Sequence, residues 1–178
     1  ENVEIKLYNK ANPLKPWKTM GRMHDKYLIA DGKVYILGGR NTYNYFLGDF
    51  PGHKNFDRDV LVVCDEPQKD NSVNQLWNYF ETIWEQEDCR YFHNSKKLAD
   101  RQSVKKAVLE LQEGYQQYFE VNKEKICDTD YADETFETEK ITLLSNPIHT
   151  QAKEPVVWYQ LGELMKNAKE RVKIHTPY

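Results

Sequence analysis

The sequence predicts an α/β or α+β fold in which helices pack on the faces of a mixed β-sheet. Two observations predict this class. Short segments with strand-like patterns alternate along the chain with longer segments whose apolar residues recur every three or four positions. In addition, 178 residues with 39% hydrophobic and 13% aromatic content are enough to build a globular core.

A β-hairpin is expected in the first quarter of the chain. Residues 23–30 and 33–37 are rich in apolar and aromatic side chains, and Asp31-Gly32 lies between them. This dipeptide is a strong hairpin signal, because both of its residues tolerate positive φ.

Two further strands flank the hairpin. Apolar and polar residues alternate over residues 3–7, with the period of a half-buried strand. Residues 60–64 are continuously apolar, which is typical of a central strand covered on both faces. Gly38-Gly39 lies between the hairpin and this run, where missing side chains allow a sharp turn or the close approach of a ligand.

Two helices are expected next. From Asn71 or Ser72, either of which is a good N-cap, apolar residues recur at helical spacing as far as Trp84. The same period runs over residues 103–119. Residues 120–138 are polar and acidic without a sustained period, so we expect a linker there.

A strand, helix, strand unit is expected at the C-terminal end. Residues 141–144 and 172–176 have the composition of strands. Residues 155–168 show helical spacing, with Pro155 in the first turn.

Composition and spacing exclude several classes of function. The net charge is −3 and no basic stripe is present, so nothing favours non-specific binding of nucleic acid. The three cysteines have no CxxC spacing and are expected to be free thiols. No apolar run is long enough to span a bilayer, and no residues show zinc-ligand spacing, so we expect no metal and no cofactor.

Three side chains near the hairpin suit phosphoryl chemistry. In an extended strand, His24 and Lys26 project from the same face. An imidazole can attack phosphorus, while an ammonium neutralises charge on the phosphate oxygens. Asn41, brought back by the two glycines, adds a neutral donor. The aromatic loop of residues 42–57, which contains His53, is expected to form a wall of the site.

The stretch HDKYLIADGKVYILGGRN, residues 24–41, resembles the HKD motif of the phospholipase D superfamily. The segments LYNKANP, RDVLVV and KEPVVWYQLGELMKNAKERVKIHTPY resemble successive blocks of bacterial cardiolipin synthases and related proteins. The resemblance implies a phospholipase D-like lobe. It departs from the usual pattern at Gly39, where Ser is more frequent, although cardiolipin-synthase-like members often have Gly-Gly there.

In the superfamily that this stretch resembles, two motifs meet across a pseudo-twofold axis and no metal is required. One histidine is phosphorylated and the other protonates the leaving alcohol. The resemblance implies that His24 is the nucleophile or its acid partner, with Lys26 and Asn41 as phosphate ligands. It makes Asp31 the motif carboxylate at the turn. It also places Asp59 as the acceptor that fixes the imidazole tautomer, with a plain surface carboxylate as the alternative.

The resemblance also divides the chain. Residues 1–135 would form most of a first lobe, and residues 136–178 the opening strand, helix and strand of a second lobe. The chain holds one motif, and its start without an initiator Met indicates a segment of a longer protein. Two arrangements stay open. Residues 139–176 complete the first sheet in permuted fashion, or two copies pair so that two His24 side chains face each other.

The favoured function is that of a phosphodiesterase or phosphatidyltransferase that acts on phospholipid, or on another phosphodiester, through a phosphohistidine. The parent protein is expected to be membrane-associated in a bacterium, and the isolated chain to be inactive unless it dimerises. A nuclease of the same superfamily and a non-catalytic phosphate-binding or interaction module are the alternatives. Arg22 and Arg58 are candidates to extend the anion site, or are solvated charges.

Overall fold

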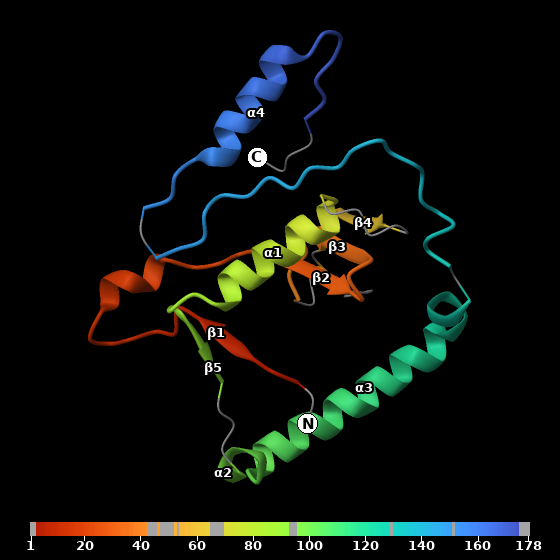
Figure 1. Cartoon of the computed structure of the whole chain (residues 1–178). Helices are drawn as coiled ribbons and strands as arrows, with labels where there is room; N and C mark the ends of the chain where they lie inside the picture. The colour runs from red at the N-terminus through yellow and green to blue at the C-terminus, as the bar shows by residue number, and fades with distance from the viewer. Residues whose placement is uncertain are drawn as a thin grey trace. The chain divides into compact units, whose positions relative to one another are not determined.

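The computed structural model describes residues 3–42, 46, 52, 54–64, 70–92, 96–128, 130–150 and 152–174 (Figure 1). These residues form helices and antiparallel strands, which confirms the predicted α+β class. The chain divides into two compact units, one of residues 1–6 and 91–137, the other of residues 7–90 and 138–178. None of the helices in the described ranges is long and apolar enough to cross a membrane.

The second unit contains a three-stranded sheet with the order β2-β3-β4. Its strands are β2 (Lys26–Ala30), β3 (Val34–Gly38) and β4 (Asp59–Val63), all paired antiparallel. The predicted hairpin is confirmed. Residues 31–33 connect β2 to β3, and within this loop Asp31 and Gly32 have φ values of 53° and 65°. The two residues therefore turn the chain in the left-handed region, as their types favour.

Two expectations about this sheet are corrected. It is antiparallel rather than mixed in every pairing among the described strands of the sheet. In addition, β4 lies at its edge and β3 at its centre, and Val60 is 58% exposed. A continuous apolar run did not distinguish a strand covered on both faces from an edge strand, because pairing partners are not encoded locally.

The core lies between one face of this sheet and α1 (Ser72–Trp84). Tyr35 and Val62 of the sheet pack with Val73 and Leu76 of the helix. Figure 1 shows α1 lying across the strands. Full burial of a side chain such as that of Leu76 contributes about 2 kcal/mol. As predicted, the helix begins after Asn71, whose side chain accepts a hydrogen bond from the Asn74 amide.

The remaining elements of the first half are short. Strand β1 (Lys6–Tyr8) pairs with β5 (Cys89–Tyr91), and η1 (Pro16–Met20) is a single 3-10 helix. Helices α2 (Lys96–Ala99) and α3 (Gln102–Cys127) follow.

Helix α3 extends beyond its predicted end at residue 119, so the expected linker is helical as far as Cys127. Residues 120–127 contain no Gly or Pro and are rich in Glu and Lys, which have good helix propensity. The loss of apolar period at residue 120 therefore did not mark the end of the helix. No side chain of α3 is buried.

Of the strand, helix, strand unit predicted at the C-terminal end, the described residues form the helix alone. Its helix is confirmed as α4 (Val156–Asn167). However, residues 141–144 and 172–174 are not strands, and residues 175–178 lie outside the described part of the chain. Ile141 and Leu143 pack against the core instead, and the Leu143 amide donates to the Gln75 side chain at 2.9 Å. Residues 139–150 and 152–174 thus add no strand to the sheet, and the permuted closure stays a prediction.

Candidate functional site

One end of the three-stranded sheet brings together residues from three parts of the motif region. Lys26 of β2 lies opposite Gly38 of β3, and Gly38 lies opposite Asp59 of β4. Directly opposed residues project on the same face of a sheet, with Cα atoms about 5 Å apart. The side chains of Lys26 and Asp59 therefore share one face and flank a glycine.

The two glycines leave room for carboxylates. A Cβ on Gly38 would lie 1.8 Å from Asp59 Oδ1, and a Cβ on Gly39 would lie 2.8 Å from Asp57 Oδ2. Contacts below 3.0 Å are not seen for real Cβ atoms. The Gly-Gly pair is thus needed because Asp57 and Asp59 fill the space that side chains would occupy, a role that the sequence analysis did not predict.

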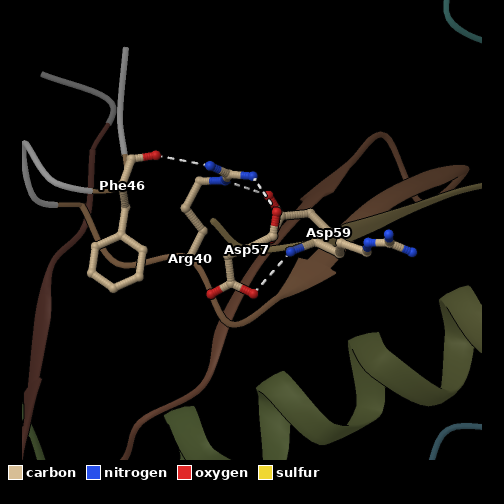
Figure 2. A network of polar contacts seen from close by, with 5 residues as sticks. Arg40, Phe46, Asp57 and Asp59 are labelled. Carbon is tan, nitrogen blue, oxygen red and sulfur yellow. Dashed lines mark hydrogen bonds and ion pairs between the residues drawn. The ribbon is translucent and has the colours of Figure 1, made fainter. Parts of the chain in front are cut away.

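Arg40 ties this turn together (Figure 2). Its Nε donates to Asp59 Oδ2 at 2.6 Å, its Nη2 to the Asp57 carbonyl at 3.0 Å and its Nη1 to the Phe46 carbonyl at 2.8 Å. The side chains of Arg40 and Asp59 are 35% and 25% exposed. Three hydrogen bonds from one planar guanidinium fix the backbone on which Asn41 follows.

Sequence reasoning missed Arg40 and gave Asp59 another role. Asp59 was expected to hold the second nitrogen of the His24 imidazole, but its carboxylate pairs with Arg40. Within the described part of the chain, no hydrogen bond joins His24 to Asp59. Two features of the sequence could have indicated this ion pair. Arg40 lies between Gly38-Gly39 and Asn41, and the segment FDRD at residues 56–59 contains two aspartates that can pair with it.

His24 and Lys26 lie where the chain enters the sheet. His24 is exposed in the segment that leads into β2, and Lys26 Nζ donates to the His24 carbonyl at 2.7 Å. The ammonium therefore lies beside the backbone of the residue that carries the imidazole. Among the described residues, neither the His24 imidazole nor the Asn41 amide has a hydrogen-bonding partner, so both can meet a ligand.

Asp31 lies at the other end of the hairpin and is not part of this cluster. Five residues of β2 separate it from the Lys26 end, which at about 3.3 Å per residue corresponds to about 16 Å. Its φ of 53° shows what it does: Asp is one of the few side chains that tolerates this region. Asp31 therefore lies in the turn, as expected, and a catalytic role for it stays a prediction.

Asp25, between His24 and Lys26, is held by α1. The Tyr79 hydroxyl donates to Asp25 Oδ2 at 2.5 Å, and the ring of Tyr79 contacts that of Tyr27, with centroids 6.2 Å apart. Burial, the hydrogen bond and the charge of Asp25 raise the pKa of Tyr79 well above its usual range. Burial, followed by the charge of Asp25, raises the pKa of Tyr27 to about 12. Both phenols are therefore protonated at neutral pH, and the Tyr79 hydroxyl, as a hydrogen-bond donor to Asp25, fixes the start of β2.

The remaining histidines, the aromatic loop and possible metal ligands add no contact to this cluster in the part of the chain that the structure describes. Of the remaining histidines, His149 Nε2 lies 3.1 Å from Glu154 Oε2, whereas His53, His93 and His175 lie outside the described residues. Most of the aromatic loop 42–57 lies outside them as well. No group of three His, Cys, Asp or Glu side chains able to hold a metal ion occurs in the part of the chain that the structure describes.

The arrangement can bind an anion and offer a nucleophile. His24 and Lys26 lie at the start of β2 and Asn41 follows the end of β3, so an imidazole, an ammonium and an amide come from segments at one end of a sheet whose backbone is braced by Arg40 and Tyr79. In comparisons with protein-family models, curated proteins and solved structures, nothing matches this chain.

Proposed function

We propose that this chain is a phosphodiester-processing lobe of the phospholipase D type, similar to cardiolipin synthases, with His24 as its nucleophile. The observation that carries the proposal is the sheet register, which returns Gly38, and with it the turn to Asn41, to the level of Lys26. A phosphate placed there meets an ammonium and an amide and lies beside an unpaired imidazole. These are the groups that phosphoryl transfer through nitrogen requires.

The reaction has two steps. An imidazole nitrogen of His24 forms a bond to phosphorus as the P–O bond to the leaving alcohol breaks, and the alcohol oxygen takes a proton from a general acid. The oxygen of water, or of a second alcohol, then bonds to phosphorus as the P–N bond to His24 breaks, and its proton passes to the group that served as general acid in the first step. Lys26 and Asn41 stabilise charge on the non-bridging oxygens in both steps. The general acid is a second histidine, from another lobe or a second copy of the chain, and is worth about 10²–10⁴ in rate.

The face of the sheet favours an amphiphilic substrate. Leu28, Ile36 and Leu61 form the next cross-strand row on the face that carries Lys26, since side chains two residues apart share a face. Leu28 is 59% and Ile36 is 43% exposed. A phosphate at Lys26 thus lies beside an uncovered apolar row, which suits a phospholipid better than a nucleic acid.

The test uses a diester that needs no general acid, octyl p-nitrophenyl phosphate. We expect a burst of nitrophenolate stoichiometric with the chain, and an acid-labile phosphoryl adduct on His24 in mass spectra. His24→Asn should abolish both, and His149→Asn is the matched control that should keep them. The methyl analogue should react more slowly than the octyl ester, and Leu28→Asn should remove that difference.

A non-catalytic phosphate-binding module is the second candidate, favoured by one observation. Asp59 is engaged by Arg40, so no described acceptor orients the imidazole of His24. This candidate predicts no burst, together with phosphodiester binding in phosphorus NMR that Lys26→Met removes. Absence of both burst and binding would refute the two candidates together.

A further inference from the structure

A cavity of about 330 Å³ lies immediately before the motif. Its walls include Tyr8 and Asn9 from the end of β1, Thr19 from η1, and Arg22 and Met23. Met23 is bonded to His24, so the cavity adjoins the residue that carries the nucleophile. Its volume is at the lower end of the range for small-ligand sites, which suits the head group of a substrate rather than a whole lipid.

The cavity is held in shape by specific contacts. Asn9 has a φ of 45°, and its side-chain amide donates to the carbonyls of Lys18 and Gly21 at 2.6 and 2.7 Å. Its backbone amide donates to the Asp88 carbonyl at 2.8 Å. Behind the wall, a Cβ on Gly21 would lie 2.8 Å from the Thr150 Cα, so this backbone is closely packed. The walls therefore do not depend on a ligand for their position.

Arg22 is the one charged side chain among the described residues that line the cavity. Lys18 Nζ lies 3.7 Å from Asp88 Oδ1, and these two charges offset each other. The Arg22 guanidinium makes one contact with the described residues, from its Nε to the Thr19 carbonyl at 3.4 Å. Its two terminal nitrogens remain open in the part of the chain that the structure describes. A pair of adjacent N–H donors on a planar cation matches two oxygens of a phosphate.

We infer that this cavity binds the alcohol portion of the phosphodiester substrate, and that Arg22 selects an alcohol carrying a second phosphate. The inference rests on the proposed function, since it is the first phosphate, held at Lys26 and Asn41, that brings the alcohol to the cavity. An alcohol with a quaternary ammonium is disfavoured, because no unpaired carboxylate among the described lining residues offsets the charge of Arg22.

The test compares three soluble diesters that differ only in the alcohol: glycerophosphoinositol, its 4-phosphate and glycerophosphocholine. Dissociation constants from phosphorus NMR titration of the whole chain should show the 4-phosphate bound about tenfold more tightly than glycerophosphoinositol, the size expected for a charge-assisted contact. Glycerophosphocholine should bind most weakly. Arg22→Gln should bring the ratio of the first two constants toward one.

Two further variants make the result specific. Arg171→Gln removes an exposed arginine that does not line the cavity, and should keep the tenfold ratio. Arg22→Lys retains the charge without the paired donors and should keep only part of the tenfold ratio. A partial ratio shows that the variant is folded and that the paired donors contribute to recognition. Equal binding of glycerophosphoinositol and its 4-phosphate by the unaltered chain would overturn the inference and leave the proposed function standing. If none of the three diesters binds while the octyl ester still gives the nitrophenolate burst, the inference is overturned and the proposed function stands.

Discussion

Replacing Gly38 with alanine tests the packing on which the candidate site depends. The new Cβ would lie 1.8 Å from Oδ1, 2.7 Å from Cγ and 3.0 Å from Cα of Asp59. The carboxylate is not free to rotate away, because Arg40 Nε holds its other oxygen at 2.6 Å. Relieving the overlap therefore means moving β4 or breaking the ion pair.

The expected cost follows from these two routes. Overpacking a fitted site costs about 1–3 kcal/mol, and loss of a partly exposed ion pair adds about 1 kcal/mol. We therefore expect Gly38→Ala to lower the free energy of unfolding by about 3 kcal/mol. Gly162→Ala in α4 is the matched control, since no atom lies within 4 Å of its Cβ. Alanine in a helix interior should leave stability unchanged or raise it by up to about 1 kcal/mol.

Urea unfolding followed by tryptophan fluorescence measures both variants, and a double-mutant cycle with Asp59→Ala isolates the cause. Without the Asp59 carboxylate, most of the penalty of alanine at position 38 should disappear, giving a coupling of about 2 kcal/mol. A coupling near zero, or equal effects of Gly38→Ala and Gly162→Ala, would show that Asp59 does not occupy the space above Gly38. In that case the account of the Gly-Gly turn is wrong.

Three other predictions concern the supports of the site. Tyr79→Phe removes the hydrogen bond to Asp25 and should lower the free energy of unfolding in urea by about 1–2 kcal/mol. It should also lower the rate of the nitrophenolate burst by a larger factor than it weakens substrate binding. Asn71→Ala removes the cap of α1 and should cost about 1 kcal/mol, with Asn71→Ser as the variant that restores it. Folding raises the pKa of Tyr27 from 10.0 to about 12, so the folded state favours the protonated phenol. The contribution of this phenol to the free energy of unfolding is complete below pH 10 and is lost as the pH rises to about 12. Unfolding free energies measured across that interval should fall, and should fall less in Tyr27→Phe; an identical slope in both would contradict the assignment.

Local patterns in the sequence were sufficient for the elements that local forces decide. The Asp31-Gly32 turn and the Asn71 cap were predicted and are confirmed, because each acts through its own backbone conformation or a hydrogen bond to a near neighbour. The segment 141–144 was misjudged for the opposite reason. A strand needs the edge of a partner, and here Leu143 gives its amide to a side chain 68 residues away along the chain.

The same limit applies to the site. Residue types and spacing indicated His24, Lys26 and Asn41 as a chemical group. They did not indicate what holds these residues, since Arg40 and Asp59 are 19 residues apart and Asp25 and Tyr79 are 54 residues apart. Such pairs become visible only when strands and helices are placed. The position of a charged residue near a motif is thus weak evidence for the partner of that residue. Asp59 was expected to pair with His24, and its carboxylate pairs with Arg40.

The spacing of the motif has a mechanical explanation in the hairpin. Strands β2 and β3 each contain five residues, so a chain that leaves Lys26 and turns at Asp31-Gly32 returns to the level of Lys26 at Gly38. The spacing therefore sets two things at once: Asp31 supplies the turn at the far end, and Gly38 begins the turn toward Asn41 at the near end. A change of one residue in either strand would shift the register and send alternate side chains to the opposite face. The groups that we propose to bind and attack the phosphate thus lie at the two ends of the motif, and the residues between them set the register that brings these ends to the same level.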